Sequence, residues 1–408
     1  MIADLHIHSR YAAACSKQTN IDLLEKHAKI KGVDLLGTGD FTHPLWIKEL
    51  KEKLSEDENG ILWTKNKFPF LWQTEISLAY TQDGKGRRVH HVVLAPNGEV
   101  VKQITDELLK KGRVDYDGRP IFGMSSVEFV EKMSNISSEI EIIPAHAWTS
   151  WFGALGSKSG FDSLQACFQE KINKIHAFET GMSSDVMMNM RIKSLDNFNI
   201  VSFSDMHSFH PWRLGREATI FSGELTYKNI LNAIRTGKNL DGTIEVYPEY
   251  GKYHWDGHRL CNIYLSPDES RKNNGICPKC HKPLTIGVEY RVEELADRPL
   301  GFKAQNYKNF YKLIPLTELI AFVYNIKQLG SKKCEEIYNR MITHLGNEYD
   351  ILINKKYEEM SRVVDKKLVD LIILNREGKL KIKPGYDGVY GEILLNNSEK
   401  IEKQATLF

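Results

Sequence analysis

Short apolar segments alternate with longer amphipathic segments through the first 235 residues of the chain. Segments with the length and composition of strands are, in order, residues 1–8, 33–40, 70–75, 88–94, 142–146, 175–179 and 200–207. Helix-length segments separate most of them, for example 21–31 and 126–133. Strands that alternate with helices predict an α/β fold with a parallel sheet, arranged as a (β/α) barrel.

Nearly every predicted strand carries histidine or carboxylate side chains at its end. His6 and His8 lie on one face of the first strand, because strand side chains alternate between faces. The later strands add Asp40 followed by His43, Glu75, His90 next to His91, His146, Glu179, and Asp205 followed by His207. A barrel gathers the carboxyl ends of its strands at one mouth. Imidazole and carboxylate without cysteine suit Zn, Mn or Fe, and burying so many of these groups without a metal would be costly.

A second group of possible ligands follows residue 235, after an aromatic crossover segment at 247–255. His258 and Cys261 are separated by two residues, as are Cys277 and Cys280, which is the spacing of a small zinc ribbon or knuckle. We expect a structural Cys3His zinc site, with His281 as the alternative histidine. The competing interpretations are four unrelated side chains in a reducing compartment, or a redox Cys-x-x-Cys pair, for which no thioredoxin-like pattern is present.

Residues 300–392 follow a helical periodicity with a mild excess of Lys and Arg. The loop at 330–333, Gly-Ser-Lys-Lys before a helix, predicts a phosphate contact, whereas most of the other lysines fit solvated helix faces equally well. At the C-terminus, Gln404, Leu407 and Phe408 resemble the peptide with which repair proteins bind a sliding clamp.

Composition narrows the function only slightly. The 408 residues carry a formal net charge of +2, so DNA affinity would have to come from local patches rather than from a global positive charge. No apolar run approaches the ~18 residues of a membrane span, and six cysteines do not form a disulfide framework. We therefore expect a cytoplasmic protein without a membrane partner.

The ordered ligands His6-x-His8, Asp40, Glu75, His90, His146 and Asp205-x-His207 resemble the PHP (polymerase and histidinol phosphatase) family of metal-dependent phosphoesterases. The resemblance implies a distorted seven-stranded PHP-type barrel at 1–235. A crossover and zinc-binding module at 236–299, a helical DNA-binding domain at 300–395 and a flexible tail at 396–408 would follow.

The resemblance also implies two or three divalent ions (Zn, Mn or Mg) in the barrel. The expected ligands are His6, His8, Asp40, Glu75, His90, His146, Glu179, Asp205 and His207. We expect His6, His8, Glu75 and Asp205 to hold one ion, Glu75 to bridge to a second held by His90 and His146, and Asp40 and His207 to complete a third. Three of these, Glu75, Asp205 and His207, would be catalytic.

Three of these assignments have alternatives. His91 would replace His90 if the strand were shifted by one residue. Glu179 either binds an ion or orients a ligand. His43 does not follow Asp40 directly, as the histidine of the family's motif does, so it is a weaker candidate.

Longer strings at 37–44, 144–152, 179–185 and 202–207, the last followed by 214–217, together with the cysteines, resemble the endonuclease Q family of PHP-type DNA repair nucleases. This implies hydrolysis of DNA on the 5′ side of deaminated bases (uracil, hypoxanthine, xanthine) and abasic sites. The alternatives are a small-molecule phosphatase of the histidinol-phosphate type and a non-catalytic DNA-binding scaffold.

Lesion recognition implies a pocket for an extruded base. The expected substrate-binding residues are Trp148, Trp151, Lys158, Ser183, Arg213 and Arg216. Packing at the barrel rim is the competing interpretation of the tryptophans, and surface ion pairs are that of the cations.

Overall fold

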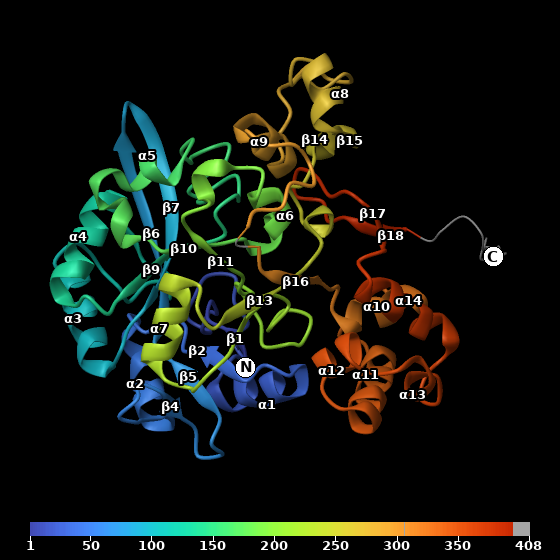
Figure 1. Cartoon of the computed structure of the whole chain (residues 1–408), viewed down its shortest axis with the longest axis horizontal. Helices are drawn as coiled ribbons and strands as arrows, with labels where there is room; N and C mark the ends of the chain where they lie inside the picture. The colour runs from blue at the N-terminus through green and yellow to red at the C-terminus, as the bar shows by residue number, and fades with distance from the viewer. Residues whose placement is uncertain (306, 395–408) are drawn as a thin grey trace.

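The computed structural model describes residues 1–305 and 307–394. Figure 1 shows a ring of strands with helices around it, a small module at the top of the view and a helical bundle at the lower right. The predicted clamp-binding residues Gln404, Leu407 and Phe408 lie outside the described residues. No helix among the described residues is long and apolar enough to cross a membrane.

Within the described residues, seven strand segments surround the candidate site. They are β1 (Ile2–Asp4), β2 (Leu35–Gly37), β5 (Pro69–Leu71) continued by β6 (Gln73–Gln82), β7 (Lys85–Leu94), β9 (Glu141–Pro144), β10 (Ala177–Glu179) and β11 (Asn199–Val201). β1 pairs with β2 and β2 with β5 in parallel, and β10 pairs with β11 in parallel. A parallel bridge between Ile7 and Met206 joins the extension of β11 to that of β1 and closes the ring. The expected α/β fold, a ring of strands with helices around it, is confirmed.

One strand departs from the parallel arrangement expected from the sequence. β7 is antiparallel to both β6 and β9. The cause is the turn at Asp83 and Gly84, whose φ angles are 52° and 72°. A two-residue turn of this kind joins antiparallel neighbours and leaves no length for a crossover helix. The turn therefore produces a long β6–β7 hairpin.

Helices connect most of the other ring strands and cover their outer face. They are α1 (Ile21–Lys31), α2 (Pro44–Lys53), α3 (Gly98–Leu109), α4 (Ser126–Ile136), α5 (Leu164–Phe168), α6 (Val186–Asn189) and α7 (Tyr227–Thr236). Local sequence sets the ends of α1: the Asn20 side chain accepts a hydrogen bond from the Leu23 amide, and Gly32 adopts φ 93° at the C-terminal end.

The remaining strands extend the ring sheets or form small hairpins. They are β3 (Ser55–Glu56), β4 (Leu62–Trp63), β8 (Ile121–Phe122), β12 (Ala218–Phe221), β13 (Leu240–Glu245), β14 (Asp256–His258), β15 (Ile263–Leu265), β16 (Asn309–Lys312), β17 (Lys381–Lys383) and β18 (Glu392–Leu394). β16 pairs in parallel with β13, so the segment that leads into the helical bundle belongs to the barrel's own sheet.

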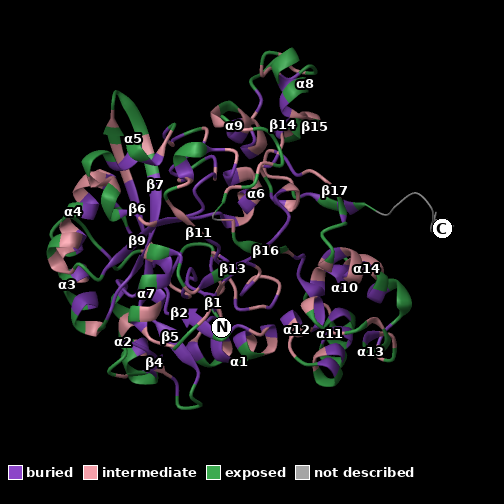
Figure 2. Cartoon of the chain, in the orientation of Figure 1, coloured by how far each residue is buried: buried purple, intermediate pink, exposed green. Residues whose placement is uncertain are grey.

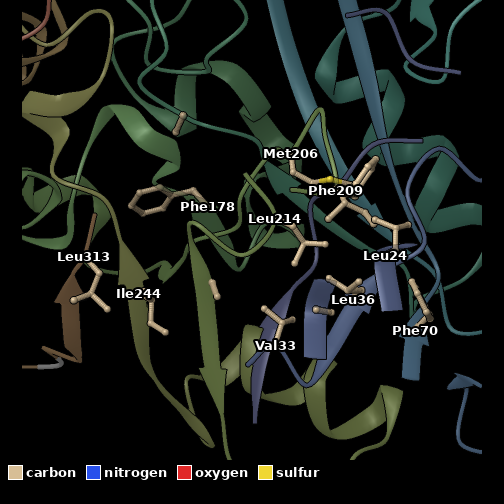
Figure 3. Packing of buried hydrophobic residues seen from close by; sticks show 14 of the residues in the cluster. Leu24, Val33, Leu36, Phe70, Phe178, Met206, Phe209, Leu214, Ile244 and Leu313 are labelled. Atoms are coloured by element: carbon tan, nitrogen blue, oxygen red, sulfur yellow. The ribbon is translucent and has the colours of Figure 1, made fainter. Parts of the chain in front are cut away.

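The later helices build the upper module and the bundle. They are α8 (Pro267–Lys272), α9 (Val288–Leu295), α10 (Leu316–Val323), α11 (Lys332–Leu345), α12 (Glu348–Ile353), α13 (Tyr357–Ser361) and α14 (Lys366–Arg376). Buried residues run from the barrel into the bundle, whereas most exposed residues lie on outer helix faces and the hairpin tip (Figure 2). Figure 3 shows strand residues such as Leu36 and Ile244 within the hydrophobic cluster that also contains Leu313.

A buried ion pair fixes the bundle to the barrel. The Lys31 Nζ atom lies 2.6 Å from Glu348 Oε1, and both side chains are almost completely buried. Glu348 also accepts hydrogen bonds from the Leu316 amide at 3.0 Å and the Tyr338 hydroxyl at 2.8 Å. Breaking a buried pair is costly because one charge stays buried without its partner.

Glu348→Ala is expected to lower the free energy of unfolding by about 3–5 kcal/mol, because Lys31 loses its counter-ion. Denaturant titration followed by circular dichroism measures this change. The double variant Lys31→Met/Glu348→Leu is the control and should recover most of the loss. A single variant as stable as the parent chain would contradict the role given to the pair.

Glu217 gives the fold a pH dependence that can be measured. Burial raises the pKa of this carboxyl group from 4.5 to about 8, while its oxygens accept hydrogen bonds from the Ser202 hydroxyl and the Val246 amide. The folded chain then binds the proton more tightly than the unfolded chain does. The contribution of Glu217 to stability is therefore greatest below pH 4.5 and falls as the pH rises to about 8.

Glu217→Gln imitates the protonated acid. Its free energy of unfolding, relative to that of the parent chain, should rise by up to about 1.4 kcal/mol for each pH unit between pH 4.5 and about 8. Urea unfolding of both proteins at pH 5, 6.5 and 8 tests this difference. Parallel stability profiles would show that Glu217 ionises normally in the folded chain.

Candidate metal centre

Glu75, on β6, lies at the centre of the clustered side chains and faces ligands on both sides. Its Oε1 atom is 2.8 Å from His90 Nδ1 and 3.1 Å from His146 Nε2. Its Oε2 atom is 3.2 Å from His8 Nε2. The carboxylate is completely buried. One carboxylate is thus shared between two sets of imidazoles.

His6 and His8 are each oriented by a carboxylate behind the ring. His6 Nδ1 lies 2.9 Å from Glu179 Oε1, and His8 Nδ1 lies 2.9 Å from Asp40 Oδ1. Such a contact fixes ring orientation and the position of the proton, as it does for histidines that bind metal. The opposite nitrogen of each ring, Nε2, is therefore directed into the cluster.

Several buried polar atoms converge without a hydrogen-bond partner. They are the Nε2 atoms of His6 and His8 and the Oδ1 atom of Asp205. Asp205 Oδ1 is 3.2 Å from His8 Nε2 and 3.7 Å from His6 Nε2. Buried polar atoms without partners are expensive, and a divalent cation between them would satisfy all three.

The donor atoms form two groups that share Glu75. One comprises His6, His8, Glu75 and Asp205, and the other Glu75, His90 and His146, with all ligand atoms of a group within 4.8 Å of one another. These are the two sets expected for the first and second ion. The donor chemistry fits divalent metal ions.

Three residues of the cluster adopt a left-handed backbone. The φ angles are 38° at Asp40, 31° at His146 and 46° at Asp205. Residues other than glycine rarely occupy this region, and those that do are concentrated at functional sites. The strained turns just beyond the strands place His146 and Asp205 in the cluster of donor atoms and Asp40 behind the His8 ring.

The electrostatics of the cluster favour added positive charge. Burial opposes protonation of His6, but Glu179 and Glu75 raise its pKa well above the usual value. Burial likewise opposes ionisation of Glu75, yet His90 and Arg119 hold its pKa well below the usual value. The carboxylates therefore attract cations into this pocket.

The structure settles the choice between His90 and His91. His90 faces the cluster, whereas His91 points to the outside of the ring, where its Nε2 lies 3.0 Å from Ser126 Oγ and its ring packs against Phe129. The alternative assignment of His91 was wrong. His43 is also outside the donor groups: its ring stacks on Tyr11 at 4.4 Å.

Three expected ligands lie beside the donor groups rather than in them. Asp40 and Glu179 contact the far nitrogens of His8 and His6, so they support ligands, as was considered for Glu179. His207 Nδ1 is 3.0 Å from the Asp205 carbonyl oxygen. The third ion position expected from Asp40 and His207 is not formed by their side chains, because Asp40 is turned toward His8 and Ser9.

Arg119 belongs to the site but was missed in the sequence. Its Nη1 atom lies 3.1 Å from Glu75 Oε2. The preceding Gly118 packs against the Asp40 carboxylate, where a Cβ atom would clash, so only glycine lets the loop approach this closely. Arg119 lies in a loop between α3 and β8 without strand or helix periodicity, and no motif marked it.

A cavity of about 640 Å³ opens over the cluster. Its lining includes the expected residues Trp151, Ser183 and Arg216, together with Lys252 and Tyr390, which the sequence did not indicate. Arg216 donates a hydrogen bond from Nε to the Ser204 carbonyl oxygen at 3.0 Å. A volume of this size accommodates a nucleotide-sized group.

Three predicted substrate contacts lie outside this cavity. Trp148 is completely buried and donates to Asn189 Oδ1 at 2.6 Å, so it is a packing residue and the prediction of a pocket wall was wrong. Lys158 lines a neighbouring groove, and Arg213 lines another cavity, where its Nη1 is 3.7 Å from Glu318 Oε1.

The full chain resembles solved endonuclease Q structures. The lesion-specific endonuclease PfuEndoQ from Pyrococcus furiosus is 30% identical with a TM-score of 0.86, and the match covers 100% of this chain and 99% of that one. The chain belongs to the endonuclease Q family. A second member, in complex with a 27-mer duplex substrate with an abasic lesion at its active site, is 31% identical with a TM-score of 0.87, covering 99% of this chain and 100% of that one.

Two sequence relatives of this endonuclease Q family member are named only as uncharacterized proteins. The uncharacterized protein MJ0043 of Methanocaldococcus jannaschii is 34% identical over 252 residues, which are 60% of this chain but 30% of that protein, so the chain spans less than a third of its length. The uncharacterized protein YqxK of Bacillus subtilis is 26% identical, covering 96% of this chain and 98% of that protein. Residues 315–379 match the model of the MJ0043 C-terminal domain, which places α10 to α14 in a recognised module.

The second group of ligands comes together in the upper module of this family member. His258, Cys261, Cys277 and Cys280 bring their donor atoms within 4.8 Å of one another, and Cys280 Sγ is 3.2 Å from His258 Nδ1. Burial opposes ionisation, but backbone amides of Cys280 and Lys279 lower the pKa of Cys277 to about 6. His281, the alternative histidine, is not in the group, and its backbone adopts a left-handed φ of 58°.

Proposed function

We propose that this chain is a metal-dependent DNA repair endonuclease that hydrolyses the phosphodiester on the 5′ side of deaminated bases and abasic sites. The observation that carries the proposal is the pair of donor groups sharing Glu75 at the base of an open cavity, in a chain of the endonuclease Q family. The family member with an abasic lesion at its active site supports the abasic substrate, because its match spans the whole of that protein.

The residues of the centre have separate roles in this proposal. His6, His8, Glu75 and Asp205 would hold one divalent ion, and Glu75, His90 and His146 a second. When bound, two such ions supply an activated water molecule and neutralise charge on the phosphate. Asp205 and His207, at the open side of the cluster, would orient and deprotonate the attacking water.

The cavity wall would hold the substrate. Arg216 and Lys252 would bind the phosphates next to the scissile bond, and Trp151 and Ser183 would contact the extruded nucleotide. A duplex that opens at a lesion loses less stacking energy than an intact one, so lesion sites enter such a pocket at lower cost.

The upper module would hold a structural zinc through His258, Cys261, Cys277 and Cys280. Three thiolates and one imidazole form a closed set, typical of zinc sites that stabilise small modules. The helical region would contact DNA. The predicted contact with a sliding clamp, through Gln404, Leu407 and Phe408, stays a prediction. A DNA substrate agrees with the expected cytoplasmic location.

Cleavage of labelled duplexes with one uracil, hypoxanthine or abasic site tests the proposed function. Reactions with Mg, Mn or Zn are compared with an undamaged duplex of the same sequence. Nicking on the 5′ side of the lesion, and not of the control, is expected. If the chain left every duplex intact but released phosphate from small monoesters, the phosphatase alternative would replace this proposal.

A further inference from the structure

A second groove, of about 560 Å³, lies beside the metal-binding cavity and runs along the β6–β7 hairpin. It lies between that hairpin, which projects at the upper left of Figure 1, and the loop at 151–159. Arg87, Arg88 and Lys158 line it, and none of the described residues in its lining is acidic. We call it the hairpin groove.

The hairpin groove adjoins the cavity over the metal centre through one shared residue. Trp151 lines both the hairpin groove and the cavity over the centre. Arg88 precedes the proposed ligand His90 by two positions on β7, so both side chains leave the same face of the strand. Two strand residues span ~7 Å, which equals the rise of about two base steps of ~3.4 Å along the DNA axis.

Hydrogen bonds hold the two walls of the hairpin groove together. The Ser159 hydroxyl donates to the Arg88 carbonyl oxygen at 3.2 Å, and the His90 amide donates to the Phe152 carbonyl oxygen at 2.9 Å. Arg87 donates to the Gly160 carbonyl oxygen and stacks on Phe161 at 4.0 Å. The loop at 151–159 and the hairpin are therefore bound together. The Arg87 side chain is used in this contact and is not free to bind a ligand.

Arg88 and Lys158 remain available to a ligand. Both side chains are exposed, and neither forms an ion pair with any of the residues that the structure describes. Two unpaired cations in a groove without carboxylates favour an anionic occupant with regularly spaced charges. A nucleic-acid backbone has this chemistry, and the groove shares Trp151 with the cavity over the metal centre.

We infer that the hairpin groove binds phosphates of the DNA strand on one side of the lesion, through Arg88 and Lys158. The inference rests on the proposed function, since it extends the substrate from the metal centre outward. It makes these two residues positioning groups for the flank of the duplex, with no part in the chemical step.

The test uses full-length chain with Arg88→Gln and Lys158→Gln, singly and together. Lys51→Gln is the matched control, because Lys51 is an exposed lysine near the end of α2, away from the hairpin groove. Circular dichroism and thermal melting verify that each variant is folded. Cleavage kinetics are measured on lesion duplexes with two long flanks, with the 5′ flank shortened, or with the 3′ flank shortened.

On the full duplex the double variant should raise KM several-fold with kcat unchanged, and Lys51→Gln should match the parent chain. The slope of log KM against log salt should fall by about 0.7–0.9 for each phosphate that the variant no longer neutralises. Shortening one flank, and not the other, should abolish the difference between parent and variant.

An unchanged KM in the double variant, or the same KM difference between parent and variant on both shortened duplexes, would overturn the inference about the hairpin groove. The proposed function would remain intact. A parent chain that cleaves none of the lesion duplexes would overturn both.

Discussion

Glu75→Gln should reduce nicking of lesion-containing DNA by about a thousandfold or more. The substitution removes the charge shared by both donor groups, so an ion bound by either group would lose affinity, and with it the activation of water would be lost. Initial rates on an abasic duplex measure the loss. Metal analysis of the dialysed protein should show that both barrel ions are depleted.

Neighbouring histidines provide a matched control for this prediction. His90→Gln should lose metal from the centre, because His90 lies 2.8 Å from Glu75. His91→Gln changes the adjacent residue on the opposite face of β7 and should keep its metal. If Glu75→Gln retained both ions and normal cleavage, the assignment of the centre would be wrong.

Cys277→Ser should lower the affinity of the upper module for zinc by at least about a hundredfold, because the buried thiolate is one of four donors. The module is small, with only the short helices α8 and α9, so metal binding would supply much of its folding energy. Zinc content by mass spectrometry and proteolysis near residue 270 measure the two effects.

Cys334→Ser is the control for that variant. Cys334 is buried and lies in the helical bundle, where its thiol donates to the Thr317 carbonyl oxygen. Its substitution should leave zinc content unchanged. A Cys277→Ser protein with full zinc content and an unaltered proteolytic pattern would exclude a structural metal in this module.

The sequence predicted which residues gather at the site better than it predicted which of them face the cluster and which lie behind another ligand. Strand periodicity was sufficient to bring His6 and His8 to one face, because that periodicity is a local property, whereas their grouping with Glu75 was implied by the resemblance to the PHP family. Whether Asp40 faces the cluster or the back of His8 depends on a left-handed turn and on the loop packed against it. Such contacts come from residues far apart in sequence, which a motif does not contain.

The direction of β7 was within reach of the sequence. Asp83-Gly84 between two apolar alternating segments is a strong hairpin signal, and it excludes the crossover that a parallel neighbour needs. Arg119 was not within reach. A single arginine in an irregular loop looks like a solvated residue until the fold brings it against Glu75.

The contact of Lys31 with Glu348 determines how far the barrel and the helical bundle can be treated as separate domains. By composition the chain separates into a barrel and a helical bundle, yet each contributes one half of a buried charge pair. A fragment ending before the bundle would contain an ammonium group whose acceptor within the fragment is the Pro211 carbonyl oxygen. The bundle alone would contain the complementary carboxylate. Separating the two parts is therefore expected to cost stability in each, because each would keep one half of the buried charge pair.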